Sequence, residues 1–120
     1  MSKNILVVDD SASIRQVVSM ALKDAGHQVI TAEHGADALA KLDGQRFHLI
    51  VSDVNMPVMD GITFVKEVKK RSDHKFTPIL MLTTESEEGK KMEGKAAGAK
   101  AWLVKPFKPE LLLSAVSKLA

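Results

Sequence analysis

The sequence predicts an α/β fold, a three-layer, doubly wound sandwich built on a five-stranded parallel sheet. Three observations favour this fold class: short apolar runs, helix-period segments between them, and a strand–helix order repeated five times. The apolar runs are continuous rather than alternating, which is typical of strands buried on both faces of a parallel sheet. Repeated strand–helix units with right-handed crossovers place helices on both faces of such a sheet.

Five segments are expected to form the strands. Four of them are apolar throughout, whereas residues 28–32 are more polar, as an edge strand often is. Each strand is followed by a segment with helical periodicity. In chain order the expected strands are residues 5–8, 28–32, 48–51, 79–82 and 101–104.

The segment after the first strand has the clearest helical pattern. Its apolar residues recur at steps of three and four, which predicts a helix with one buried stripe. We expect Ser13 and Gln16 to form a capping box at its start and Gly26 to end it in the left-handed conformation. The expected stripe consists of Ile14, Val17, Val18, Ala21, Leu22 and Ala25.

Four further helices complete the pattern. The helix expected at residues 85–97 has a Thr84/Glu87 capping box at its start. Gly89 and Gly94 each cost it about 1 kcal/mol relative to Ala, so it should be the loosest element. The apolar faces of the other helices are expected at Ala36, Leu39 and Leu42, at Ile62, Phe64, Val65 and Val68, and, after Pro109 in a first turn, at Leu112, Ala115, Val116 and Leu119.

Length and composition narrow the possible functions. The 120 residues suit one domain, expected to span 1–120, and 17 basic against 15 acidic side chains leave a charge of only +2. This small, scattered excess disfavours nucleic-acid binding. Cysteine is absent, which fits a reducing compartment, and we expect a cytoplasmic location. The apolar runs are too short for a membrane span or a signal peptide, so no membrane association is expected.

Polar residues interrupt the apolar pattern at the ends of the expected strands. Asp9 and Asp10 follow the first strand, Asp53 the third, Thr83 the fourth and Lys105 the fifth. In an open parallel sheet, ligands bind at the carboxyl ends of strands where the strand order reverses. In the order 2-1-3-4-5 this reversal falls between the first and third strands, and the three aspartates would then meet.

Three neighbouring carboxylates predict a bound cation. They cannot all stay ionised without shifted pKa values or a cation among them, and all-oxygen ligands favour a hard ion such as Mg²⁺. Lys105 adds an ammonium and Thr83 a hydroxyl at the same edge. These groups suit phosphoryl transfer, in which an aspartate can itself be the nucleophile.

Together these residues resemble the receiver domains of bacterial two-component response regulators, most closely the single-domain, CheY-like chemotaxis type. The resemblance also implies the flavodoxin-like strand order 2-1-3-4-5, because a receiver of this type is a known example of that order. The resemblance extends from Asn4 to Leu119. Its motifs are Asp9-Asp10, Asp53 within Ser52-Asp53-Val54-Asn55-Met56-Pro57, Asp60-Gly61, Thr83 and Lys105-Pro106.

The resemblance implies a role for each motif residue. Asp53 would accept the phosphoryl group. Asp10 and Asp53 would bind Mg²⁺ through their side chains, Asn55 through its backbone carbonyl, and Asp9 mainly through water. Lys105, aimed by a cis bond to Pro106, would contact the phosphoryl oxygens. The switch residues would be Thr83, which moves toward the phosphoryl group, and Trp102, which turns inward behind it.

Four positions bear on how closely the chain follows the family: two differ from its common pattern, and two match the chemotaxis type. Trp102 stands where Tyr or Phe is more usual, and its indole N–H needs a partner when buried, which makes the switch geometry a point to examine. Asn55 and Glu85 match the chemotaxis type at positions that tune hydrolysis of the aspartyl phosphate. Thr84 replaces a smaller residue and could restrict the attacking water.

The resemblance implies a stand-alone switch with protein partners. A sensor histidine kinase would donate the phosphoryl group, and a surface made of the helix at 85–97, the strand at 101–104 and the last helix would bind a target such as the flagellar motor switch. A phosphatase is a further possible partner, and a monomer is expected. The protein would catalyse only its own phosphorylation and dephosphorylation and would otherwise be no enzyme.

Other interpretations stay open at this point. A phosphate sink or relay receiver would use the same site without a motor target. A phosphatase of the haloacid dehalogenase type expects an aspartate two residues after its nucleophile, where Asn55 stands. A flavodoxin-like nucleotide carrier wants a hydroxyl- or glycine-rich loop after the first strand. Taken singly, the Asp9–Asp10 pair and Asp60-Gly61 are most simply a turn or a helix cap.

Overall fold

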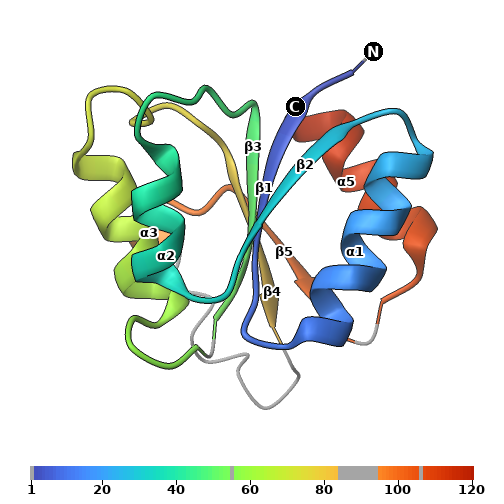
Figure 1. Ribbon diagram of the computed structural model, residues 1–120, viewed down its shortest axis with the longest axis horizontal. Helices are drawn as coiled ribbons and strands as arrows, with labels where there is room; N and C mark the ends of the chain where they lie inside the picture. Colours follow the sequence, from blue (N-terminus) through green and yellow to red (C-terminus); the bar gives the residue numbers. More distant parts are fainter. Residues whose placement is uncertain (1, 55, 84–94, 106) are drawn as a thin grey trace.

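The computed structural model describes residues 2–54, 56–83, 95–105 and 107–120. Its five strands form one parallel sheet in the order β2-β1-β3-β4-β5, which confirms the predicted fold class and order (Figure 1). The more polar strand β2 lies at an edge, as expected. The strands are β1 (Asn4–Val8), β2 (Gln28–Ala32), β3 (Leu49–Asp53), β4 (Ile79–Thr83) and β5 (Ala101–Val104).

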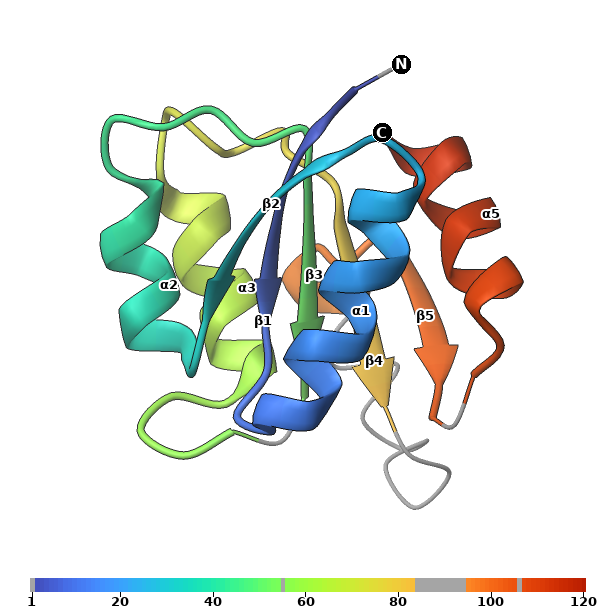
Figure 2. The same ribbon diagram turned by 45° about the vertical axis from the view of Figure 1, so that its right-hand side comes forward.

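Helices cover both faces of the sheet and make it the middle of three layers. In Figures 1 and 2, α1 (Ala12–Asp24) and α5 (Pro109–Leu119) lie together on one face, and α2 (Gly35–Leu42) and α3 (Gly61–Lys70) lie together on the other. Every strand residue of β3 and β4 is buried, because these central strands have neighbours on both sides and helices above and below.

Alternate residues of each strand build two separate cores. Leu6, Ile50 and Met81 pack with Phe64 and Val68 beneath α2 and α3. The residues between them on the same strands face the opposite way, where Ile5, Val7, Val51, Leu80 and Leu82 pack with Leu22 and Leu112 beneath α1 and α5. Each such buried side chain contributes about 1.5–3 kcal/mol relative to an exposed one, so the continuous apolar runs stabilise both interfaces at once.

Two expectations for the first helix are wrong. Ser11, not Ser13, caps α1 by accepting the Ile14 N–H at 3.3 Å. The reason is that the Asp9 carboxylate accepts the Ser11 N–H at 2.9 Å, which turns the chain into the helix earlier. Val17 and Ala25, placed on the buried stripe, are exposed, Val17 by 56%, because the contact surface around Val18 and Leu22 is narrower than the apolar pattern.

Most other helix predictions are confirmed. Gly26 has a φ of +94°, the left-handed conformation expected after α1. The predicted apolar residues of α3 are all buried, and Leu112 and Val116 are the buried residues of α5. The helix expected at 85–97 lies mostly outside the described residues, although residues 95–97 are helical. Within the described part of the chain, no helix is long and apolar enough to cross a membrane.

Candidate functional site

The polar residues singled out in the sequence gather at one edge of the sheet. Asp9 directly follows β1, Asp53 and Thr83 are the last residues of β3 and β4, and Lys105 follows β5. All strands are parallel and in close register, so their carboxyl ends meet at the same edge, where the arrowheads of Figure 2 point. The fold therefore brings together residues that are up to 96 positions apart in the sequence.

Three carboxylates form the centre of this site. One oxygen atom each of Asp9, Asp10 and Asp53 lies within 4.8 Å of the others. Asp9 and Asp53 are buried, with 0% and 5% of their surface exposed, whereas Asp10 is exposed, so the cluster opens to solvent on the Asp10 side. Mg²⁺ is usually held by one or two carboxylates and keeps several water ligands. The residues present therefore fit a hard divalent cation.

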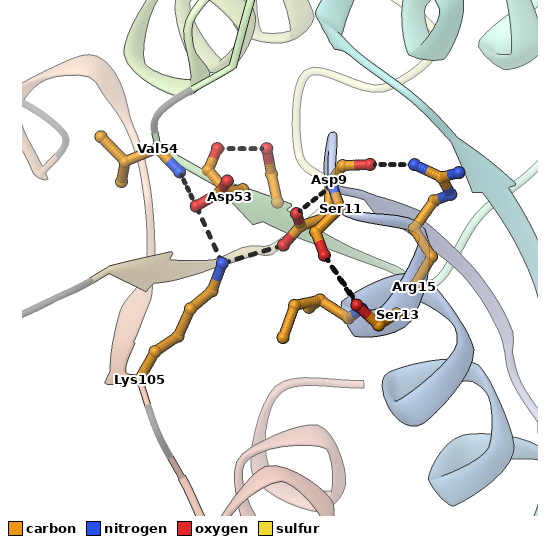
Figure 3. A network of polar contacts seen from close by, with 9 residues as sticks. Asp9, Ser11, Ser13, Arg15, Asp53, Val54 and Lys105 are labelled. Atoms are coloured by element: carbon orange, nitrogen blue, oxygen red, sulfur yellow. Dashed lines mark hydrogen bonds and ion pairs between the residues drawn. The ribbon is translucent and has the colours of Figure 1, made fainter.

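Lys105 links the two buried acids. Its Nζ lies 3.0 Å from Asp9 Oδ2 and 3.2 Å from Asp53 Oδ1, and its side chain is 18% exposed (Figure 3). Burial alone would lower the pKa of Lys105, but the hydrogen bond to Asp9 and the charges of both acids outweigh burial and raise that pKa. The ammonium therefore stays charged and neutralises only part of the three negative charges.

The Asp53 carboxylate has one occupied and one open oxygen. Oδ1 accepts the Val54 N–H at 2.9 Å as well as the Lys105 ammonium (Figure 3). Among the described residues, no hydrogen bond reaches Oδ2, which leaves this oxygen open to a further ligand. The Ser52 hydroxyl donates to the Asp53 carbonyl at 3.0 Å and holds the backbone at the same point.

Burial and charge make Asp53 a stronger base than an ordinary aspartate. Burial raises the pKa of Asp53 to about 6, and the neighbouring charge of Asp9 acts in the same direction. The Lys105 ammonium and the Val54 N–H oppose the shift without cancelling it. At neutral pH the carboxylate is mostly ionised, yet its charge is poorly compensated, which makes a cation favourable here.

The other predicted site residues lie on neighbouring strands. Thr83 is fully buried at the end of β4 and pairs in register with Val104. Trp102 lies opposite Met81 on β5 and is half-buried against the core beneath α2 and α3. Four other expectations concern residues outside those that the structure describes. They are the metal ligand Asn55, the Thr84/Glu87 capping box, the tuning position Glu85 and the cis bond to Pro106.

Two residues at the start of α3, Asp60 and Gly61, have roles that the sequence indicated only in part. Asp60 caps α3, because its Oδ1 accepts the Thr63 N–H at 2.8 Å, which confirms the simple interpretation as a helix start. The role of Gly61 was missed: its N–H donates to the Val54 carbonyl at 2.7 Å, and a Cβ there would meet the Asp53 carbonyl and lie 2.8 Å from the Val54 Cα. Only the Asp-Gly pair itself hints at such an approach.

The chain is similar to known proteins over its whole length. The family model of the response regulator receiver domain matches residues 5–117. Chemotaxis protein CheY1 of Helicobacter pylori is 39% identical over 110 residues, which is 90% of this chain and 89% of the relative. PilG of Pseudomonas aeruginosa is 38% identical over 112 residues, 93% of this chain and 83% of the relative.

Solved structures of receiver proteins are similar to this chain as well. The chemotaxis response regulator CheY4 of Vibrio cholerae matches with a TM-score of 0.94 and 57% identity, and the match covers 100% of both chains. The receiver domain of a Pseudomonas aeruginosa sensor histidine kinase, solved with a magnesium ion in its active-site cleft, matches with a TM-score of 0.91 and 27% identity over 99% of this chain and 98% of that one.

Proposed function

The chain belongs to the response regulator receiver family, in its CheY-like form, and we propose on this premise that it is a stand-alone phospho-accepting switch of two-component signalling. Asp53 would accept a phosphoryl group from the phosphohistidine of a sensor kinase, with Mg²⁺ present. One observation carries the proposal: Asp9, Asp10 and Asp53 bring carboxylate oxygens within 4.8 Å of one another, with Lys105 reaching into the cluster.

The proposed reaction is a displacement at phosphorus. Asp53 Oδ2 attacks, a P–O bond forms, the P–N bond of the phosphohistidine breaks, and its electron pair stays on the imidazole nitrogen, which takes up a proton. The raised pKa of Asp53 supports its role as nucleophile. Lys105, 3.2 Å from Asp53, is placed to neutralise charge that develops on the phosphoryl oxygens.

Mg²⁺ would be held by Asp10 and Asp53, with Asp9 acting mainly through water and Asn55 through its carbonyl. When bound, the ion would neutralise negative charge on the carboxylates and the phosphoryl oxygens. The magnesium reported for the related sensor-kinase receiver supports this part of the proposal. The contacts of Asp9 support a role through water rather than as a direct ligand, because both of its carboxylate oxygens already accept hydrogen bonds, from Ser11 and Lys105.

The output would be a protein-binding surface that Thr83 and Trp102 re-pose after phosphorylation. We place it on the segment 85–97, β5 and α5, and its partner would be a target such as the flagellar motor switch, which fits the chemotaxis relatives. A hollow of about 820 Å³ runs along β5 and α5, and its lining includes Trp102, Phe107 and the exposed Leu111. Its largely apolar lining supports a protein partner rather than nucleic acid.

The remaining parts of the proposal rest on the sequence. The chain would form one receiver domain over residues 1–120, act as a monomer in the cytoplasm, and catalyse only its own phosphorylation and, with or without a phosphatase, dephosphorylation. Partner capture by the phosphorylated form alone would separate the switch from a phosphate sink.

The test uses Trp102, the single tryptophan of the chain, as an optical probe. Addition of Mg²⁺ and a small acyl phosphate should change its emission, and Asp53→Asn should abolish the response to the phosphate donor. Thr63→Ser, a change on the exposed side of α3, is the matched control and should respond as the wild type does. A phosphorylated product still formed by Asp53→Asn would place the acceptor elsewhere and contradict the proposal.

A further inference from the structure

The peptide unit between the two neighbouring acids is held by a residue with no part in the proposed reaction. Arg15, in the first turns of α1, donates from Nη1 to the Asp9 carbonyl oxygen at 2.7 Å (Figure 3). The Asp9 N–H donates to the Ala32 carbonyl at 3.1 Å. The carboxylate of Asp9 accepts from the Ser11 N–H and from Lys105. Every polar atom of Asp9 is therefore bonded, and Arg15 supplies the contact to its carbonyl.

This contact bears on Asp10 rather than on Asp9. The Asp9 carbonyl and the Asp10 nitrogen belong to one planar peptide unit, so a fixed carbonyl sets the plane from which the Asp10 side chain departs. Asp10 is exposed, and no hydrogen bond from a described residue reaches its carboxylate. Its position in the cluster therefore depends on the backbone that carries it.

We propose that Arg15 is a positioning residue for the metal site: it fixes the Asp9–Asp10 peptide so that Asp10 points into the cluster before the ion arrives. This inference rests on the proposed function, which supplies Mg²⁺ as the ligand. Figure 3 shows the guanidinium on the side of Asp9 that faces away from Lys105 and Asp53. Arg15 would thus act through the backbone and not as a ligand of the ion.

Two effects of Arg15 have opposite signs, which makes the inference testable. Its positive charge alone would weaken Mg²⁺ binding, so a purely electrostatic role predicts tighter binding when the charge is removed. A positioning role predicts weaker binding, because residues that orient metal ligands typically change affinity by 10- to 100-fold. The direction of the change in Mg²⁺ affinity therefore decides between the two.

The experiment measures Mg²⁺ affinity by calorimetry on the full chain, without any phosphate donor. Arg15→Met should weaken Mg²⁺ binding about tenfold. Arg15→Lys and Arg15→Gln, which retain an N–H donor, should recover part of the loss. Lys69→Met is the matched control: it removes a helix cation that donates to the Lys75 and Thr77 carbonyls at the other end of the sheet, and it should leave Mg²⁺ affinity unchanged.

Each outcome has one meaning. Unchanged or tighter Mg²⁺ binding by Arg15→Met, with normal binding by the wild type, would overturn the positioning role and leave the proposed function intact. A wild-type chain that binds no Mg²⁺ would overturn the proposed use of the ion and this inference with it. Thermal unfolding without Mg²⁺ checks that each variant is folded. If Arg15→Met fails to fold, Arg15→Gln, which also removes the charge, is compared with the wild type: weaker Mg²⁺ binding supports the positioning role, and unchanged or tighter binding overturns it.

Discussion

Charged side chains are paired at the amino ends of the strands but left partly uncompensated at the carboxyl ends. At the amino edge, Arg71 Nη2 lies 2.6 Å from Asp43 and 2.9 Å from Asp73, and all three side chains are at least 27% exposed. At the carboxyl edge, three carboxylates lie together, and Lys105 pairs with the two buried ones, Asp9 and Asp53. Water and paired partners satisfy the first set, whereas the second keeps an excess of negative charge. Charge that is left uncompensated despite its cost marks the edge where a ligand is expected.

Backbone packing gives the largest expected effect and the first way to test this contrast. Gly61→Ala at the carboxyl edge would push a Cβ against the Asp53 carbonyl and the Val54 Cα, so we expect a loss of about 3 kcal/mol or more in unfolding free energy. Gly35→Ala is the matched control, because the atoms nearest to its Cβ belong to the Met59 side chain, at 2.9–3.0 Å, and not to the backbone. Equal losses in urea unfolding would contradict this difference.

The second test removes the cation of each edge. Lys105→Met leaves Asp9 and Asp53 buried without their partner, and we expect a loss of about 3 kcal/mol at pH 8, partly restored by Mg²⁺. Arg71→Met breaks only exposed ion pairs and should shift the urea midpoint far less. If Arg71→Met cost as much as Lys105→Met, the two edges would not differ in the way described.

Much of this contrast is predictable from the sequence. Apolar runs that end in Asp9, Asp53 and Lys105 locate the charged edge, since the ends of parallel strands must meet. The contacts of Gly61 and Arg15 are not predictable, because they depend on where a loop carbonyl points and leave no periodic signal. The same holds for Ser11, whose capping role is set by its bond to the Asp9 carboxylate.

A third test uses pH. The pKa of Asp53 is about 6 in the folded chain, above the ordinary 3.8, so the folded state binds a proton more tightly than the unfolded state. Its stabilising contribution is therefore complete below about pH 4 and lost as pH rises through about 6. Without Mg²⁺, Asp53→Asn should gain on the order of 2 kcal/mol over the wild type at pH 8, and little at pH 4. Urea unfolding at both pH values measures this, and an equal gain at both would show that uncompensated charge on Asp53 is not the cause.

The smallest expected effect concerns backbone strain, in which the two edges also differ. The helix-to-strand turns at the amino edge place glycine at positive φ, in Gly26, Gly44 and Gly98, whereas the loop after Asp53 places Val58 there, with φ of +69° and 79% of its surface exposed. A β-branched residue is strained in this conformation, and Asn tolerates it better. Val58→Asn should therefore raise the unfolding free energy by about 1 kcal/mol, because strain of 1–3 kcal/mol is partly relieved. Gly44→Val should produce a loss of similar size, since it introduces the same strain at the other edge; a Val58→Asn variant no more stable than the wild type would mean that this loop carries no such strain.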